Sequence, residues 1–269
     1  MKIGNREFET GKHTYVMGIL NVTPDSFSDG GKYDVLSRAI EHASQMVIDG
    51  VDVIDVGGES TRPGYTMISE EEEMERVVPA IKAVKERWDV PVSVDTYKAK
   101  VAKAALEAGA DMVNDIWGLR YDEEMAEVVK KAGVPVCIMH NRKEADYTDY
   151  MEDVFKDMEE SLQIAKKAGI RPEQIILDPG IGFAKSYEQN LFMLKHLNAL
   201  GKFGYPLLLG SSRKSVIGHT LDLPADEREE GTIVTSVLAA QAGYFMVRVH
   251  DVKKNARAIK MVEAVRDAE

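Results

Sequence analysis

The sequence lacks the features that would place it in a membrane or in a disulfide-stabilised class. Cys137 is the only cysteine among 269 residues, which excludes an internal disulfide. No apolar run approaches the ~20 residues that a membrane-spanning helix needs. Residues 1–11 also lack the cationic start and apolar stretch of a signal peptide. We therefore expect a cytoplasmic protein.

Positive charge is also scarce. The chain has 34 Lys and Arg residues against 45 Asp and Glu residues, which gives a net charge of −11. Nucleic acids and anionic membranes bind to basic surfaces that replace their counterions, so this balance argues against both as partners. An anionic small-molecule substrate would need a local basic cluster.

What is present is the composition of an ordinary globular protein. Apolar residues make up 44% and charged residues 29%, so the chain can bury a core without a disulfide or a metal. At roughly 150 residues per domain the length allows two domains, but a closed α/β barrel uses about 250 residues in one. Short β-branched runs alternate with helical stripes to the end, without a Pro/Ser-rich linker. This pattern predicts one domain over residues 1–269.

The alternation contains eight expected strands, each followed by a helical segment. They end near Asn21, Val56, Asp95, Asp115, Met139, Asp178, Gly210 and Val249. Apolar strands joined by crossover helices form a parallel sheet, and eight such units close most readily into a barrel. The alternative is an open, doubly wound sheet, but the Gly-rich dinucleotide turn is missing after the first strand. We therefore predict an α/β fold of the (β/α)8, or TIM, barrel type.

Polar residues gather where the expected strands end, which is the face that carries the active site of a barrel. Asp95, Asn114 and Asp178 lie at three of these ends. Two carboxylates and an amide on one rim suit a flat heterocycle with an amino-amide edge, because charge-assisted hydrogen bonds are strong. Either aspartate taken alone could equally be a structural cap. Their shared rim favours a binding role.

A second group of residues at this face is basic. The segment GSSRKS contains Arg213 and Lys214, and the segment RVHD contains Arg248 and His250. Phosphate sites in barrels cluster after the seventh and eighth strands, where these segments lie. We therefore predict an anion site, with a solvated Arg/Lys pair as the alternative.

Metal-ligating patterns are sparse. The sequence contains no HExxH, no CxxC and no clustered acidic loop. His140 and His250 do not form a ligand set, and we expect His140 to be structural. Any metal should therefore be a phosphate-bound Mg²⁺ that keeps most of its waters.

Six segments of the chain resemble, in order, the signatures of the dihydropteroate synthase family. They are MGILNVTPDSFSDGG, GGESTRPG, SVDT, DPGIGF, GSSRKS and RVHDV, and they span nearly the whole chain. The first two are highly specific. The resemblance implies a pterin-binding (β/α)8 barrel, usually a homodimer. It also implies a transferase that condenses 6-hydroxymethyl-7,8-dihydropterin pyrophosphate with p-aminobenzoate to give 7,8-dihydropteroate and pyrophosphate.

The same resemblance implies roles for individual residues. The pterin pocket would be lined by Asp95, Asn114, Asp178, Lys214, Met139 and Phe183. Pyrophosphate would be held, with Mg²⁺ at Asn21, by Asn21, Arg62, Arg248 and His250. p-Aminobenzoate would be surrounded by Phe27, Thr61, Pro63, Lys214 and Ser215. The residues expected to take part in catalysis are Asp29, Lys214 and Asn21.

One segment departs from the family pattern. Many members follow the fifth-strand Met-His pair with a Gly/Pro-containing turn, whereas His140 is followed here by Asn141, Arg142, Lys143 and Glu144. This leaves the shape of that loop open.

From the chemistry of the reaction we expect a dissociative, SN1-like substitution, because a ring-conjugated methylene can bear positive charge while cations stabilise the departing pyrophosphate.

Two other functions compete with this interpretation. A methyltetrahydrofolate-dependent methyltransferase resembles this family in barrel and pterin pocket, but it would not need the basic cluster. A catalytically silent pterin-binding barrel is the other, since fold and pocket alone do not establish turnover.

The segment Thr232–Gly243 is nearly apolar all round, so we also predict a homodimer through the helices that follow the seventh and eighth strands.

Overall fold

The structure is a computed structural model that describes residues 1–23, 32–60 and 67–268. Within them, parallel strands form one sheet in the order β8-β7-β6-β5-β4-β3-β10-β9. The strands are β3 (Tyr15–Asn21), β4 (Val53–Gly57), β5 (Val92–Asp95), β6 (Met112–Asp115), β7 (Val136–Met139), β8 (Ile175–Asp178), β9 (Leu208–Leu209) and β10 (Met246–Val249).

The two edges of this sheet meet. Leu177 on β8 forms a parallel bridge with Leu207, just before β9, and its N–H donates to the carbonyl of Pro206 at 2.9 Å. The sheet is therefore a barrel, and the predicted (β/α)8 fold is confirmed. The strands end within one residue of the predicted positions.

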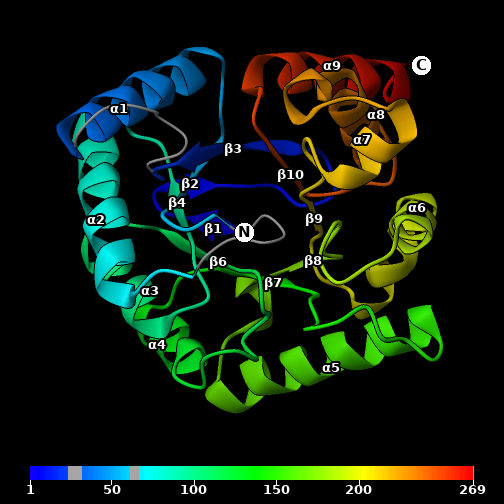
Figure 1. The fold of residues 1–269 in the computed structure, drawn as a ribbon, viewed down its shortest axis with the longest axis horizontal. Coiled ribbons are helices and arrows are strands. Elements are labelled where there is room, and N and C mark those ends of the chain that lie inside the picture. The colour runs from blue at the N-terminus through cyan, green and yellow to red at the C-terminus, as the bar shows by residue number, and fades with distance from the viewer. Residues whose placement is uncertain (24–31, 61–66, 269) are drawn as a thin grey trace.

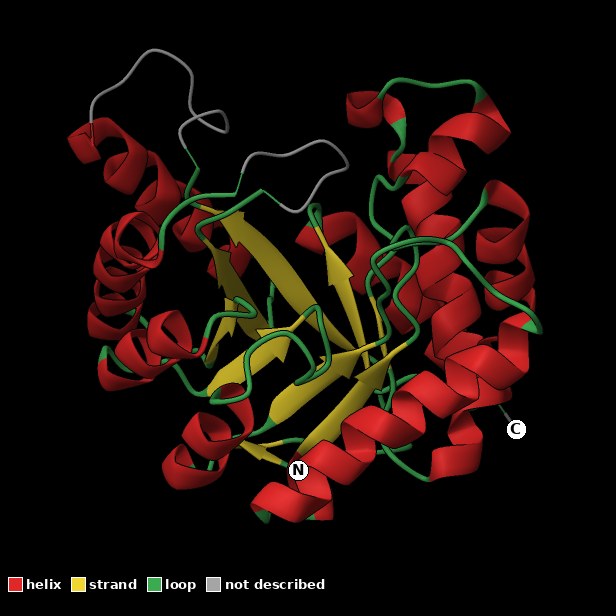
Figure 2. Ribbon diagram, turned by 60° about the horizontal axis from the view of Figure 1, so that its bottom comes forward, coloured by secondary structure: helices red, strands yellow, loops and turns green. Residues whose placement is uncertain are grey.

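Helices surround the strands in chain order (Figures 1 and 2). They are α1 (Lys32–Ile48), α2 (Glu70–Arg87), α3 (Ala99–Glu107), α4 (Met125–Ala132), α5 (Tyr150–Ala168), α6 (Tyr187–Lys195), α7 (Ser215–Leu221), α8 (Glu229–Gln241) and α9 (Val252–Arg266). Short 3₁₀ turns lie at Pro172–Gln174, Leu197–Phe203 and Ala225–Glu227. Local chemistry sets several boundaries. Ser186 and Gln189 form a capping box at the start of α6, and Gly169 ends α5 with a left-handed backbone.

Alternate residues of the strands face two different cores, as the period of a strand requires. One set packs outward against the helices and includes Val16, Ile54 and Val113. The other set fills the barrel interior and includes Met17, Val53 and Met112. Polar residues at the carboxyl ends of the strands, such as Asn21, Asp95 and Asp178, follow this inner core along the barrel.

A short N-terminal hairpin, β1 (Lys2–Ile3) with β2 (Arg6–Glu7), was not anticipated from the sequence. Ile3 on β1 and Phe8, directly after β2, are buried and pack in the inner core with residues of the barrel strands. The hairpin therefore closes the amino-terminal end of the barrel and leaves the opposite end for the site. Within the described residues, every helix falls short of the length and apolarity that crossing a membrane demands.

Candidate active site

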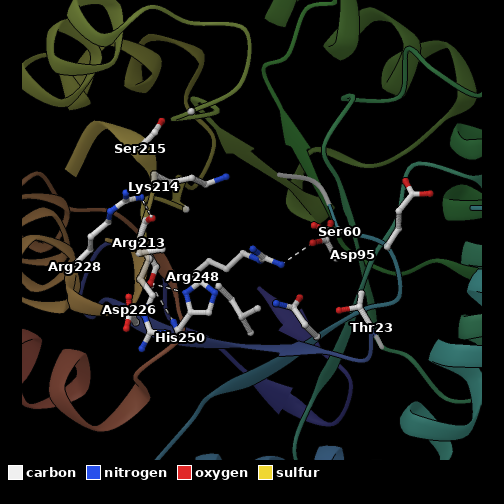
Figure 3. A pocket seen from close by; sticks show the side chains of 17 residues that line it. Thr23, Ser60, Asp95, Arg213, Lys214, Ser215, Asp226, Arg228, Arg248 and His250 are labelled. Carbon is white, nitrogen blue, oxygen red and sulfur yellow. Dashed lines mark hydrogen bonds and ion pairs between the residues drawn. The ribbon is translucent and has the colours of Figure 1, made fainter. Parts of the chain in front are cut away.

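A cavity of about 510 Å³ opens at the carboxyl ends of the barrel strands (Figure 3). Its lining includes Asn21 on β3, Asp95 on β5, Lys214 after β9, and Arg248 and His250 at the end of β10. Residues that are 229 positions apart in the chain, from 21 to 250, thus share one cavity because the barrel closes. Of the two predicted carboxylates, Asp95 lines this cavity together with the predicted basic residues Arg213, Lys214, Arg248 and His250.

The floor of the cavity is a buried network of charge. Arg248 donates from Nε to Asp55 Oδ2 and from Nη2 to Asp95 Oδ2, both at 2.6 Å, and Figure 3 shows its guanidinium reaching toward Asp95. Asn114 Nδ2 donates to the same Asp55 oxygen at 3.1 Å. Burial raises the pKa of Asp95 to about 7, and the Arg248 charge opposes that rise. The cation and the carboxylates therefore hold one another in place.

Two acceptors in this network are left over. Asp55 Oδ1 and Asp95 Oδ1 are buried, and neither has a hydrogen-bond partner among the described residues. Buried carboxylate oxygens are costly to leave unpaired, so this floor is suited to a ligand that donates N–H groups. Sequence reasoning missed Asp55. The available signal was a carboxylate inside the otherwise apolar strand VIDVG.

Asp178 lies at the end of β8 on the same floor. Its Oδ1 accepts the N–H of Gly180 at 2.7 Å, and burial raises its pKa to about 6. Met139 belongs to a small apolar cluster with Phe183 packed against it, and Lys214 Nζ lies 4.1 Å from the centroid of the Phe183 ring. Of the six residues predicted for the pterin pocket, Asp95 and Lys214 line the cavity, whereas Asn114, Met139, Asp178 and Phe183 lie on neighbouring strands and loops and are not among its lining residues.

The opposite side of the cavity is built for anions. The His250 N–H donates to Ser212 Oγ at 3.2 Å, and Ser212 Oγ lies 2.9 Å from His250 Nδ1. A hydroxyl that accepts one bond can donate its proton to Nδ1, which places the imidazole proton on Nε2. Ser212 and Arg228, which also lines the cavity, were not predicted. Arg228 follows a 3₁₀ turn distant from every motif, so the sequence carried no signal for it.

The residues around Asn21 show whether the cavity fits the expected Mg²⁺ ion. The Asn21 side chain lines the cavity, and its Oδ1 lies 3.5 Å from the position that a Cβ on Gly57 would take. Across the described residues there is no group of three His, Cys, Asp or Glu side chains that could hold a metal. One protein oxygen fits an ion whose remaining ligands are phosphate oxygens and water.

Five predicted site residues, Phe27, Asp29, Thr61, Arg62 and Pro63, lie outside the described residues. The base of the second loop is described. Buried Glu59 accepts hydrogen bonds from the Ile68 N–H at 2.9 Å, from Tyr97 at 2.5 Å and from Lys98 at 2.8 Å. Glu59 therefore ties the two ends of this loop together, a function that the sequence did not suggest.

The segment after His140, which differs from the family pattern, is also among the described residues. Arg142 Nε donates to Asp157 Oδ2 on α5 at 2.5 Å, and Arg142 lies over the Tyr147 ring. His140 is completely buried, and its Nε2 lies 2.9 Å from Oδ2 of the same aspartate. None of these residues is among those that line the cavity.

Residues 17–250 match the family described as pterin binding enzyme. The dihydropteroate synthase of Clostridium beijerinckii is 56% identical over 266 residues, covering 98% of this chain and 99% of that relative. The structure of the Clostridium difficile dihydropteroate synthase in the presence of pteroic acid has a TM-score of 0.95 at 51% identity, covering 97% of this chain and all of that one.

A more distant structure has the same fold. The structure of the Xanthomonas albilineans dihydropteroate synthase in complex with 7,8-dihydropteroate has a TM-score of 0.89 at 38% identity, with 97% of each chain covered. Because the family match, the sequence identity and the fold agree along nearly the full length, the chain belongs to the dihydropteroate synthase family of pterin-binding enzymes.

Proposed function

We propose that the cavity joins 6-hydroxymethyl-7,8-dihydropterin pyrophosphate to p-aminobenzoate, which gives 7,8-dihydropteroate and pyrophosphate. The observation that carries this function is that Asp95, whose buried Oδ1 has no hydrogen-bond partner among the described residues, shares one cavity with the basic side chains of Lys214, Arg248 and His250. The carboxylate suits the N–H groups of a pterin, and the basic side chains suit the pyrophosphate attached to it. The activity is that of a transferase.

The pterin ring would lie on the floor between Asp95, Asn114 and Asp178, with Met139, Phe183 and Lys214 around it. The Asn114 amide is already oriented, because its Nδ2 donates to Asp55. Its Oδ1 is thereby assigned as the acceptor for a ligand. Asp178 uses one oxygen for Gly180, which leaves the other for the amino-amide edge of the pterin.

The pyrophosphate group would be held by Asn21, Arg62, Arg248 and His250. The His250 Nε2–H, set by Ser212, is a suitable donor for a phosphate oxygen. Mg²⁺ would be held by Asn21 together with pyrophosphate oxygens and water, and when bound it would supply positive charge to the leaving group. p-Aminobenzoate would contact Lys214 and Ser215, with Phe27, Thr61 and Pro63 from the loops.

The substitution is dissociative. The bond between the pterin methylene carbon and the bridging oxygen breaks, and its electron pair leaves with pyrophosphate. The amine nitrogen of p-aminobenzoate then bonds to the methylene carbon and releases a proton. Arg248 and His250 would stabilise the departing charge, while Asp29 would stabilise the cationic pterin. Orientation of the amine, with Lys214 beside it, can contribute roughly 7 to 11 kcal/mol.

The assembly would be a homodimer through α8 and α9. The inner face of α8 is polar or small, because Thr235 and Ser236 are buried, whereas Val234 and Leu238 are 57% and 40% exposed. On α9, Met261 and Val265 are 64% and 65% exposed. Apolar side chains on the outer faces of two packed helices favour burial against a second copy. We propose that the whole chain, 1–269, works as one pterin-binding domain in the cytoplasm.

A coupled assay tests the function. With pterin pyrophosphate, p-aminobenzoate and Mg²⁺, the purified protein should form dihydropteroate and release one pyrophosphate for each product molecule. Pterin binding without turnover would indicate the silent barrel. Methyl transfer from methyltetrahydrofolate, with no dihydropteroate formed, would indicate the methyltransferase.

A further inference from the structure

Lys185, His140 and Asp157 form a chain of hydrogen bonds next to the loop between β8 and α6. His140 Nε2 lies 2.9 Å from Asp157 Oδ2, and His140 Nδ1 lies 2.9 Å from Lys185 Nζ. None of the three is among the described residues that line the cavity. The reaction as derived above leaves them without a role.

The polarity of this chain follows from its chemistry. An ammonium group has no lone pair, so Lys185 must donate to His140 Nδ1. The imidazole proton therefore lies on Nε2 and is donated to the Asp157 carboxylate. Burial and the nearby Lys185 charge lower the pKa of His140 to about 4, which keeps the ring neutral and able to accept.

The other two protons of the Lys185 ammonium reach the loop between β8 and α6. They are donated to the carbonyls of Gly180 at 2.9 Å and Phe183 at 3.0 Å. In this loop Gly180, Gly182 and Ala184 have left-handed backbones, with φ of 69°, 82° and 42°. Such a backbone cannot form a regular hydrogen-bond ladder, so its carbonyls need partners from side chains.

This loop shapes the floor and wall of the pterin pocket. The Gly180 N–H holds one oxygen of Asp178, and the Phe183 ring packs against Lys214. Gly180 is pressed against the end of β7, since a Cβ there would lie 1.9 Å from the His140 carbonyl oxygen. A shift of the loop would therefore displace Asp178, Phe183 and Lys214 relative to one another.

We propose that Lys185 is a positioning residue for the pterin substrate, whose ammonium, anchored through His140 to Asp157, holds the Gly180–Phe183 loop in its binding form. The proposal rests on the proposed function and assigns no direct contact with substrate to Lys185. His140 is the connector that joins the loop of β8 to α5. This hydrogen-bonded series gives a role to a lysine and a histidine that lie side by side but do not line the cavity.

The kinetic test compares Lys185→Met with Lys195→Met. Methionine keeps the length of the side chain and removes its three donors, whereas Lys195 is exposed at the end of α6 and serves as the matched control. In Lys185→Met the KM for pterin pyrophosphate should rise about tenfold or more, while the KM for p-aminobenzoate changes by less than about threefold. A variant that merely loses folded protein would lower the apparent kcat and leave KM unchanged.

Burial lowers the pKa of Lys185 to about 7, against the opposing effect of Asp178 and Asp157, so the assays are run at about pH 6.5. In Lys185→Ala, added propylammonium should restore part of the pterin KM, and tetrapropylammonium, which has no N–H, should not. A folded Lys185→Met protein with a pterin KM within about twofold of wild type would overturn the proposal.

A measurement on the unaltered protein keeps the proposal testable if the variants do not fold. In ¹⁵N-histidine spectra at about pH 6.5, where Lys185 is mostly the ammonium, His140, assigned by its loss in His140→Gln, should carry its proton on Nε2. An Nδ1–H tautomer would contradict the hydrogen-bond chain. Failure of the proposed function would appear differently, as absence of dihydropteroate formation by the wild-type protein, and calorimetry with pterin pyrophosphate would then still compare the variants.

Discussion

Arg248 Nη2 donates to Asp95 Oδ2 at 2.6 Å, so a cation proposed for the pyrophosphate is bonded to a carboxylate proposed for the pterin. The same guanidinium also pairs with the buried Asp55. The two halves of the site are therefore electrostatically coupled. If bound pyrophosphate drew the Arg248 guanidinium toward itself, Asp55 Oδ2 and Asp95 Oδ2 would lose their donor and could accept hydrogen bonds from the pterin.

Replacing Arg248 should cost stability as well as activity. Arg248→Met leaves Asp55 and Asp95 buried without their cation, and breaking a buried ion pair costs roughly 3 kcal/mol or more. Urea unfolding at about pH 8 should show this loss. Arg257→Met, at an exposed position on α9, is the control and should unfold like the wild type. Equal stability of the two variants would contradict the coupling.

Asp178→Asn should weaken pterin binding with little effect on the fold. The substitution removes a charge-assisted acceptor at the rim and leaves the barrel packing intact, so we expect a loss of roughly 2 to 3 kcal/mol in calorimetry. The pKa of Asp178 is raised to about 6 by burial, and the proposed contact with the pterin requires the ionised carboxylate as the acceptor. Affinity of wild-type protein for 6-hydroxymethyl-7,8-dihydropterin should therefore rise with pH through about 6, less steeply in the variant. Near-wild-type affinity of Asp178→Asn would refute the assignment.

Ser212→Ala should weaken the binding of inorganic pyrophosphate. Without the hydroxyl, His250 loses the contact that places its proton on Nε2, and we expect a loss of about 1 kcal/mol, or roughly fivefold in Kd. Ser211→Ala is the matched control, because the Ser211 hydroxyl is 2.8 Å from Thr235 on α8 instead. The same pyrophosphate Kd in both variants would show that His250 needs no such support.

His140 should make the protein less stable in mild acid. Its pKa falls from 6.5 to about 4 on folding, so the unfolded chain binds a proton first as the pH drops. The free energy of unfolding should therefore fall between about pH 6.5 and pH 4, by roughly 3 kcal/mol at most. The pKa of Asp157 is lowered by its bonds to His140 and Arg142 despite burial, so its contribution is lost only at lower pH.

Urea unfolding of the wild type and His140→Gln at about pH 7 and pH 5 measures this effect. The difference in stability between the two proteins should shrink at the lower pH. A constant difference would mean that His140 does not titrate in this window.

The proposed dimer can be tested through the exposed face of α8. Light scattering at micromolar concentration should give twice the mass of the chain, and Val234→Glu should give a monomer because it buries a charge in an apolar interface. Leu191→Glu on α6, at a residue 39% exposed, should remain a dimer. A monomeric wild-type protein would exclude the assembly.

Much of the site could be predicted because its residues lie at strand ends, which hydrophobic alternation locates within one residue. Asp95, Asn114 and Asp178 were found in this way, and the basic segments after the last two strands followed from the same logic. Asp55 and Ser212 were missed. A carboxylate in the apolar strand VIDVG and a serine in the segment GSSRKS are each compatible with a structural role, and only the closed barrel shows that they contact Arg248 and His250.

The sequence by itself determined the eight strand–helix units, the face on which polar residues gather and, through its motifs, the family. These properties depend on periodicity and on residue types at short spacing. Only the tertiary structure decided that Arg248 pairs with Asp55, 193 positions away, and that the N-terminal hairpin closes the barrel. The physical reason is that such contacts exist only once the sheet has closed, because closure sets which distant side chains share the same buried space.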